Sequence, residues 1–311
     1  SSHLIVSGMY RYFQLARCFR DEDLRADRQP EFTQIDIEAS FITPEDLYTL
    51  TEGMLQALFA VAGIQIATPF PRMTYADAME NYGCDRPDMR FGLQIRDVTS
   101  VFRESDFAIA RAAIASGGRV RGIVIPGGAS LSRKQVDEIE VAARSAGAAG
   151  LMRIKCVNGV VDGAPAKALT DAGRAALQLS DGDLMLLVAG PDHISNPALD
   201  RTRQDAARRM SLVPDGASEL LWVTDFPMFA VDPEAGRLDA MHHPFTAPNP
   251  EDLGFLDSDP ARVRALAYDV ILNGTELGGG SIRIGDPALQ RRVLSLLGID
   301  SSTAEERFGF L

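Results

Sequence analysis

The chain has 311 residues, enough for a large buried core and typically for two domains, since single domains cluster at about 100–150 residues. With 43 acidic and 31 basic residues the net charge is −12, which argues against non-specific binding to nucleic acid through the global field. No apolar stretch approaches the roughly 20 residues that cross a bilayer, so we expect no membrane span and no secretory segment. The three cysteines are far apart and form no CxxC pair, which favours a reducing cytoplasm over a disulfide framework or a zinc site.

Near the N-terminus, two segments that alternate like half-buried strands enclose a densely charged loop. The apolar residues that share one parity are Phe13, Leu15 and Phe19 before the loop and Ile35, Ile37 and Phe41 after it. Because side chains alternate along a strand, the pattern predicts a hairpin with an apolar underside. Its other face carries Gln34, Asp36 and Glu38. Two interpretations stay open: an amphipathic hairpin with a solvated top, or the floor of a ligand site.

A helix is predicted over residues 43–63, where Thr43 or Pro44 begins it and Gly63 ends it. Its apolar stripe consists of Leu47, Leu50, Met54, Leu55 and Leu58. A shorter helical piece is predicted near Tyr75–Tyr82. The following residues are rich in Pro, Asp, Arg and Gly, and we place a domain boundary near Pro87–Gly92.

The middle of the chain alternates strands and helices. Strands are predicted at residues 120–125, 151–157 and 183–188. Ser132 and Gln135 form a capping box that opens a helix ending near Ala146, and a second helix is predicted over Pro165–Leu177. This βαβ-like module ends in a predicted helix over Arg201–Met210.

After the module, short strands are predicted at residues 220–225, 228–231 and 238–243. A helix follows over Pro260–Leu272, with Asp259 as its N-cap and Pro260 at its first position, and then a glycine-rich strand over Glu276–Ile284. The pattern indicates one domain that is split by an inserted one.

The glycine-rich strand contains Gly278, Gly279 and Gly280, followed by Arg283. Glycines weaken a strand, so we expect another group to approach this backbone closely, either a ligand or a packed element of the protein. Arg283 is suited to grip a carboxylate with two hydrogen bonds. Glu276 and Arg283 have opposite parity, so both reach one site only through a bulge. The segment is neither a GxxxxGK[ST] phosphate loop nor GxGxxG.

Two further groups are candidates for chemistry. Of His242 and His243, one could hydrogen-bond a substrate carboxylate, although a structural hydrogen bond is the more common role for a histidine. Asp269 and Glu276 could share Mg²⁺ through oxygen ligands, although an exposed helical aspartate is the simpler interpretation of Asp269. Arginines on a hairpin, an acidic pair and an arginine on a glycine-rich strand together suit a nucleoside triphosphate and a carboxylate substrate.

The run from Phe19 to Asp36 closely resembles motif 2 of class II aminoacyl-tRNA synthetases, specifically the bacterial-type aspartyl-tRNA synthetases. Asp225-Phe226-Pro227, the run from His242 to Thr246, and Glu276–Ile284 resemble the same family in the same order. The resemblance implies an α+β fold, with an antiparallel sheet flanked by helices and interrupted by an inserted α/β domain similar to the family's GAD domain. The implied domains are a first catalytic part at 1–89, the GAD-like insertion at 90–212 and a second catalytic part at 213–311.

The resemblance also implies a role for each matching residue in the activation of aspartate by ATP and its transfer to tRNA. Arg20 would bridge the ATP α-phosphate and the aspartate carboxylate. The implied ATP-site residues are Arg20, Asp21, Glu22, Gln29, Phe32 and Glu276. The implied aspartate-site residues are Arg20, Gln34, Asp36, His242 and Arg283. Arg25 and Arg28 would approach the tRNA, and Asp269 and Glu276 would hold Mg²⁺.

The sequence departs from the family in several places. It begins almost at motif 2, without the anticodon-binding barrel and motif 1, and it ends before motif 3. We therefore expect this chain alone to be inactive, and the homodimer expected for the family lacks its interface motif here. Gly285 replaces a usual histidine. The alternative to a partial aspartate–tRNA ligase is a synthetase-like binding protein without aminoacylation activity, and an amidotransferase subunit is a weaker third hypothesis.

Overall fold

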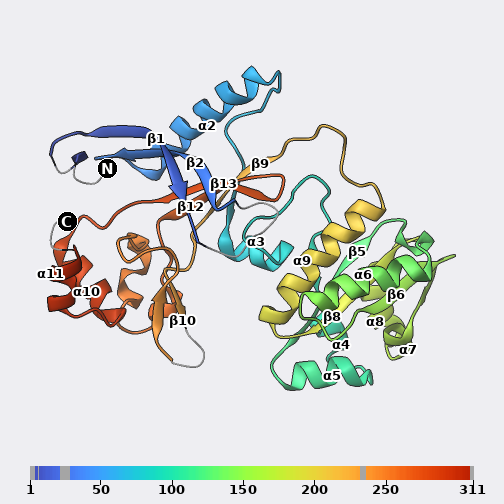
Figure 1. Ribbon diagram of the computed structural model, residues 1–311. Coiled ribbons are helices and arrows are strands. Elements are labelled where there is room, and N and C mark those ends of the chain that lie inside the picture. The colour runs from blue at the N-terminus through green and yellow to red at the C-terminus, as the bar shows by residue number, and fades with distance from the viewer. Residues whose placement is uncertain (1–3, 6, 22–28, 232–235, 309–311) are drawn as a thin grey trace. The chain divides into compact units, whose positions relative to one another are not determined.

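The computed structural model describes residues 4–5, 7–21, 29–231 and 236–308 (Figure 1). Contacts between residues divide the chain into two compact units. The first unit consists of residues 1–71, 224–269 and 278–311, and the second of residues 72–223 and 270–277. None of the described helices is both long and apolar enough to span a membrane.

The first unit begins with the predicted hairpin. Strands β1 (Arg11–Phe19) and β2 (Glu31–Ala39) pair antiparallel, with Gln14 opposite Asp36. The predicted burial of its apolar face is wrong: Phe13 is 72% exposed and Leu15 is 70% exposed, whereas Tyr12 and Gln14 on the other face are half-buried. Alternation determines which side chains share a face, but packing against other elements decides which face is covered.

Helix α2 (Pro44–Val61) follows the hairpin. The side chain of Thr43 accepts a hydrogen bond from the Asp46 N–H, and the Asp46 side chain accepts one from the Thr43 N–H. This capping box gives partners to two backbone N–H groups that have none within the helix. The predicted stripe is only partly right, because Leu50 and Leu58 are about half exposed and the buried positions are Tyr48, Glu52 and Leu55. The Tyr48 ring packs edge-on against Tyr268, with centroids 5.1 Å apart, which joins α2 to a strand far away in sequence.

The later part of the first unit contains short elements. They are β10 (Phe229–Val231), β11 (Leu238–Ala240), the 3₁₀ helices η2 (Pro250–Phe255) and η3 (Pro260–Arg262), and the helices α10 (Pro287–Leu296) and α11 (Ser301–Phe308).

The helix predicted over Pro260–Leu272 is wrong. After the single turn of η3, for which Asp259 makes no side-chain cap, the chain enters strand β12 (Ala267–Leu272). Ala267, Tyr268 and Ile271 are all at least 97% buried, so this strand is covered on both faces and shows no alternation. A short continuous apolar run of this kind does not distinguish a strand from a buried helix.

Strand β12 is followed by β13 (Thr275–Ser281), and the turn between them is Asn273-Gly274. Both turn residues have positive φ angles, 52° and 82°, as a two-residue type I′ hairpin requires. A four-stranded sheet has the order β13-β12-β9-β3, with β9 at Leu220–Thr224 and β3 at Arg72–Thr74.

The second unit is built on a five-stranded sheet with the order β4-β5-β8-β6-β7. Its strands are β4 (Ile95–Asp97), β5 (Arg119–Ile125), β6 (Met152–Val157), β7 (Val160–Asp162) and β8 (Leu184–Gly190). All neighbouring pairs are antiparallel. Because β5 and β6 both run antiparallel to the intervening β8, they are parallel to each other, and α6 connects them. The βαβ-like prediction therefore holds in a split form.

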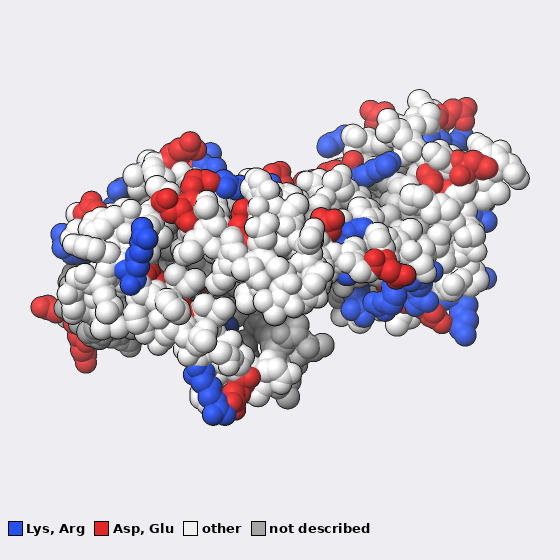
Figure 2. Space-filling view, turned by 90° about the horizontal axis from the view of Figure 1, so that it is seen from above, with Lys and Arg blue, Asp and Glu red and all other residues white. Residues whose placement is uncertain are grey.

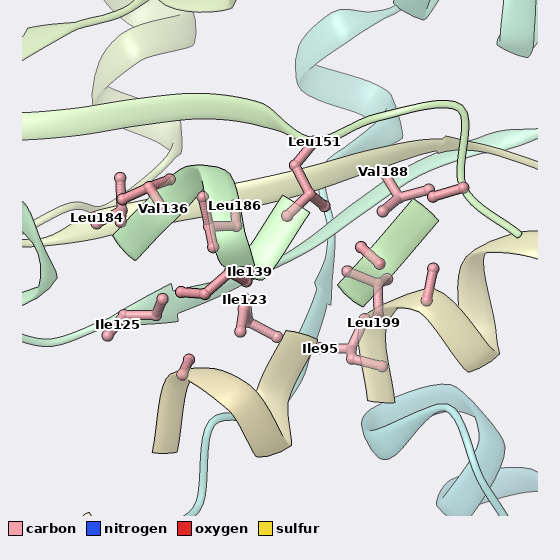
Figure 3. Packing of buried hydrophobic residues seen from close by; sticks show 14 residues of the cluster. Ile95, Ile123, Ile125, Val136, Ile139, Leu151, Leu184, Leu186, Val188 and Leu199 are labelled. Atoms are coloured by element: carbon pink, nitrogen blue, oxygen red, sulfur yellow. The ribbon is translucent and has the colours of Figure 1, made fainter. Parts of the chain in front are cut away.

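Helices cover both faces of this sheet (Figure 1). Those of the second unit are α3 (Tyr75–Tyr82), α4 (Thr99–Phe102), α5 (Ala108–Ala115), η1 (Gly128–Ser130), α6 (Arg133–Ser145), α7 (Ala164–Lys167), α8 (Asp171–Ala176) and α9 (Asp192–Arg209). On one face, Ile123, Leu186 and Val188 of the strands pack against Ile139 of α6 and Leu199 of α9 (Figure 3). The alternate residues Val124, Met185 and Leu187 belong to the core of the opposite face.

Two helix predictions in this unit need correction. The single helix predicted over Pro165–Leu177 is two short helices, α7 and α8. Thr170 lies between them with an extended backbone, and its side chain caps α8 by accepting a hydrogen bond from the Gly173 N–H. The helix predicted to begin at Arg201 begins at Asp192 and contains Pro197. The capping box of Ser132 and Gln135 on α6 is confirmed.

Candidate active site

The half-buried face of the hairpin carries a chain of hydrogen bonds. Gln14 donates through Nε2 to Asp36 Oδ2 at 3.0 Å, and its Oε1 accepts from the Tyr12 hydroxyl at 2.8 Å. On the same face, the Cys18 thiol lies 3.5 Å from Oε1 of Gln34. The register explains the contact of Gln14 with Asp36, because directly opposed residues in an antiparallel pair share a face, and it places the diagonal neighbours Cys18 and Gln34 on that face too. Gln34 and Asp36, both predicted site residues, therefore lie on one surface.

Arg20 lies where the hairpin leads into the charged loop. Its backbone N–H donates to the Pro30 carbonyl at 2.9 Å, and its guanidinium carbon is 5.1 Å from the centre of the Phe32 ring. This cation–π contact brings together two of the residues predicted to line the ATP site. Asp21 and Gln29 are exposed at the edges of the loop. The predicted site residues Glu22, Arg25 and Arg28 lie outside the described residues.

The second cluster surrounds His243. Nη1 of Arg283 lies 2.7 Å from Nε2 and 3.0 Å from Nδ1 of this imidazole. Ser281 Oγ is 3.1 Å from Nε2, and the Phe245 N–H donates to Nδ1 at 3.2 Å. Burial lowers the pKa of His243 to about 4, and the nearby charges of Arg283 and His242 act in the same direction.

Backbone pairing brings Arg283 to this cluster. Strand β13 ends at Ser281, two residues before Arg283. The alternation of side chains along the strand therefore does not fix the direction of Arg283, and no bulge is needed to bring it to the site. Instead Arg283 forms an isolated antiparallel bridge with Thr246, and the Ile284 N–H donates to the Phe245 carbonyl at 2.9 Å. Gln290 of α10 donates to the Pro244 carbonyl at 2.8 Å, which ties the same segment to the following helix.

His242 points to different partners. Its ring packs edge-on against Phe226, with centroids 5.0 Å apart, and Phe226 is 2% exposed. The neighbouring Asp225 has a positive φ of 56° and accepts hydrogen bonds from the Thr224 hydroxyl at 2.9 Å and from Asn249 Nδ2 at 3.3 Å. The buried Phe226 thus supports the ring of His242, and its neighbour Asp225 is held by hydrogen bonds.

The glycine-rich strand is approached closely, as predicted, and the approaching groups belong to the protein. A Cβ atom at Gly279 would lie 2.0 Å from Oδ1 of Asp269, and one at Gly280 would lie 2.7 Å from Cε2 of Tyr268. Nothing lies within 4 Å of the corresponding position at Gly278. Asp269 is on β12 rather than on a helix, and Glu276 is on β13. Within the described residues no group of three or more His, Cys, Asp or Glu could hold a metal ion.

On the face shown in Figure 2, charged side chains of both signs are scattered in small groups between larger areas of uncharged surface. This mixture agrees with the many arginine–carboxylate pairs of the described residues.

The chain matches the family described as tRNA synthetases class II (D, K and N) over residues 2–311, and it belongs to that family. It is 45% identical over 313 residues to the aspartate–tRNA(Asp/Asn) ligase of Caldanaerobacter subterraneus subsp. tengcongensis. It is 47% identical to that of Chlamydia trachomatis serovar D and 46% identical to that of Desulfatibacillum aliphaticivorans. Each match covers 99% of this chain and 53% of the relative, so the chain spans about half the length of these relatives.

Sequence reasoning missed three residues of the site. Gln14 donates a hydrogen bond to Asp36, and Tyr12 donates one to Gln14. The register counted back from the charged loop would have placed Gln14 opposite Asp36. The sequence allows either histidine to hydrogen-bond a carboxylate and the resemblance gives this role to His242, whereas His243 is the histidine in contact with Arg283. No local signal distinguishes the two adjacent histidines, because Arg283 is 40 residues away in the chain.

Proposed function

We propose that this chain carries the aspartate-activating site of an aspartate–tRNA ligase. The observation that carries the proposal is the contact of the Arg283 guanidinium with His243. A neutral imidazole holds Nη1 of its guanidinium, and the remaining edge, Nε with Nη2, has the geometry for a carboxylate. The matched relatives are ligases for aspartate, whose side chain is such a carboxylate.

The hairpin supplies the other half of the proposed site. Arg20 binds the α-phosphate of ATP and the α-carboxylate of aspartate, and Phe32 stacks on adenine. Asp36, which the Gln14 amide orients, meets the amino group of aspartate. The remaining proposed contacts are Asp21, Glu22, Gln29 and Glu276 for ATP, and Gln34 and His242 for aspartate.

The proposed reaction has two steps. A carboxylate oxygen of aspartate attacks the α-phosphorus of ATP, the bond to the β-phosphate oxygen breaks, and pyrophosphate leaves. The 3′-terminal ribose hydroxyl of tRNA then attacks the acyl carbon and gives its proton to the phosphate of the departing AMP, which leaves with the electrons of the broken C–O bond. Arg20 neutralises the negative charge that develops on the α-phosphate in the first step, which is the kind of electrostatic assistance that phosphoryl-type transfers need most.

Asp269 and Glu276 are the proposed Mg²⁺ ligands. Their carboxylates are the hard oxygen donors that Mg²⁺ prefers, and the missing Cβ at Gly279 leaves room for the Asp269 carboxylate at that strand. When bound, the ion would offset charge on the ATP phosphates.

The proposal extends to partners and organisation. Arg25 and Arg28 would approach the acceptor end of tRNA. Residues 90–212 would form a GAD-like insertion between catalytic parts at 1–89 and 213–311. We further propose a homodimer that works in the cytoplasm.

Calorimetry with a non-hydrolysable aspartyl-adenylate analogue tests the proposed site on this chain. We expect the analogue to bind, and Arg20→Ala to weaken binding by about 100-fold, the scale on which one preorganised charge acts. Arg17→Ala is the matched control, because Arg17 lies on the opposite face of the same hairpin, paired with Glu31, and should change affinity less than about twofold. Failure of the folded chain to bind the analogue would contradict the proposal.

Aspartate-dependent ATP–pyrophosphate exchange then tests the activity of this chain itself. Exchange that Arg20→Ala abolishes supports the ligase and contradicts the expected inactivity of the chain alone. Binding of the analogue without any exchange agrees with that expected inactivity and also with a synthetase-like binding protein.

A further inference from the structure

His243 is surrounded by groups that can donate hydrogen bonds to it. They are Arg283 Nη1 at 2.7 Å, Ser281 Oγ at 3.1 Å, the Phe245 N–H at 3.2 Å and Thr246 Oγ1 at 3.2 Å. The guanidinium and the backbone N–H are donors only, whereas the two hydroxyls can act either way. The imidazole must therefore keep at least one bare nitrogen.

A neutral imidazole meets this need when Nδ1 is the bare nitrogen, because Nδ1 can accept from the Phe245 N–H at 3.2 Å and from Arg283 Nη1 at 3.0 Å, while Nε2–H donates to Ser281 Oγ at 3.1 Å. A protonated ring has donors at both nitrogens and would face the Arg283 guanidinium with a like charge. The low pKa of His243, caused by burial, Arg283 and His242, agrees with a ring that is neutral at physiological pH. The charged or titratable groups that act on it are thus Arg283 and the adjacent His242.

We propose that neutral His243 is a positioning residue, which holds Nη1 of Arg283 so that the Nε and Nη2 edge of the guanidinium receives the side-chain carboxylate of aspartate. The identity of the ligand in this inference rests on the proposed function. The pairing of His243 with Arg283 rests on the contacts between these two side chains.

Anchoring matters here because Arg283 is an exposed side chain that follows the end of β13. A long arginine side chain loses much rotamer freedom when it binds a ligand. A contact that already fixes Nη1 reduces this cost and orients the fork for a two-point contact. A side-chain carboxylate can accept both bonds, whereas the amide of asparagine can accept only one and presents its NH₂ to a donor.

The first test follows the imidazole itself. Nitrogen-15 spectra of the histidine rings, with His243 assigned through His243→Asn, should show a neutral ring down to about pH 5. Arg283→Met should raise the pKa of His243, because a nearby positive charge is removed. The exposed His193 serves as internal control and should not respond. A His243 ring that titrates identically with and without Arg283 would overturn the pairing.

The second test measures binding by calorimetry in the folded chain. His243→Phe keeps a planar ring but removes the acceptor, and we expect it to weaken aspartate binding at least tenfold while ATP binding changes less than twofold. His243→Asn restores an acceptor and should recover most of the loss, which a merely structural role would not predict. The aspartate-to-asparagine affinity ratio should fall in His243→Phe and recover in His243→Asn.

The outcomes distinguish the two levels of inference. Unchanged aspartate binding in His243→Phe, with binding intact in the wild type, overturns the positioning role and leaves the proposed function standing. Absence of aspartate binding in the wild type, with the ring titration as expected, overturns the proposed function and leaves the pairing of the side chains. If His243→Phe does not fold, Arg283→Met still decides the pairing through the ring spectra.

Discussion

At the scale of single residues, Arg203 shows how a buried charge organises a connecting segment of the second unit. Its side chain is fully buried, with the guanidinium 4.7 Å from the Tyr82 ring centre and 4.9 Å from that of Phe91. It donates to the backbone carbonyls of Leu93, Gly92 and Asp88 at 2.8, 2.7 and 3.1 Å. One side chain thus satisfies several carbonyls of a segment that has no regular structure.

We expect Arg203→Met to lower the free energy of unfolding by at least about 2 kcal/mol, because three backbone carbonyls lose a charged donor and two rings lose a cation. Arg201→Met, an exposed position on the same helix, should stay within about 0.5 kcal/mol of the wild type. Urea unfolding followed by circular dichroism measures both. Equal stability of the two variants would contradict this account of Arg203.

At the scale of elements, the glycines of β13 reflect the packing of β12 beneath them. Tyr268 of β12 is 3% exposed, and its ring is confined between Gly280 and Tyr48 of α2. Burial raises the pKa of Tyr268 to about 12, so its hydroxyl stays protonated. The strand therefore needs glycine where an aromatic ring, not a ligand, occupies the space above the backbone.

Gly280→Ala should destabilise the protein by about 1–3 kcal/mol, because the new methyl group would overlap a ring that has no room to move. Gly278→Ala is the matched control two residues earlier in the same strand, where the added methyl group meets open space. Thermal unfolding of the two variants gives the comparison. A Gly278→Ala variant as unstable as Gly280→Ala would indicate that backbone freedom, and not the contact with Tyr268, is what matters.

At the scale of the whole molecule, the acidic composition is compensated locally by arginines. Arg119 donates to Glu80, Asp97 and Asp192 at 2.8 to 3.0 Å, and Arg264 donates to the buried Asp252 at 2.8 and 3.0 Å. The hydrogen bond from Arg119 lowers the pKa of Glu80, and that from Arg264 lowers the pKa of Asp252. A net charge of −12 therefore coexists with carboxylates that are stabilised in their ionised form.

These shifts predict the direction of the pH dependence. A carboxylate whose pKa is lowered by folding stabilises the folded state above its unfolded pKa, and this contribution is lost as the pH falls through the folded pKa. His243 acts in the same direction at higher pH: its folded pKa of about 4 lies below the ordinary 6.5, so the unfolded state takes up the proton first as the pH falls. Asp200, whose pKa is raised by burial, opposes the trend.

We therefore expect the melting temperature to fall as the pH is lowered from 7 to 3. His243→Asn should flatten the decline between about pH 6.5 and 4, and Arg119→Gln should flatten it at lower pH, because Glu80 and Asp97 lose their partner. Differential scanning calorimetry at matched ionic strength measures these slopes. A melting temperature that rises on acidification would contradict the assignment of paired carboxylates.

Much of this protein follows from its sequence alone. The run from Phe19 to Asp36 was sufficient for the family, and the period-2 pattern on both sides of the charged loop predicted the paired strands β1 and β2. Capping signals at Ser132 and Gln135 placed the start of α6 correctly, because a helix start depends on side chains within one turn. Such features are local in the chain, and so is their physical cause.

Tertiary structure decided what depends on distant partners. It buried both faces of β12, which made a strand look like a helix, although the Asn273-Gly274 turn was a local sign of the hairpin. It left Phe13 and Leu15 exposed on a hairpin whose apolar face was expected to be covered. It also selected His243 rather than His242 as the partner of Arg283. Periodicity and motifs record which side chains lie together on an element, whereas burial and long-range pairing arise only when elements pack against one another.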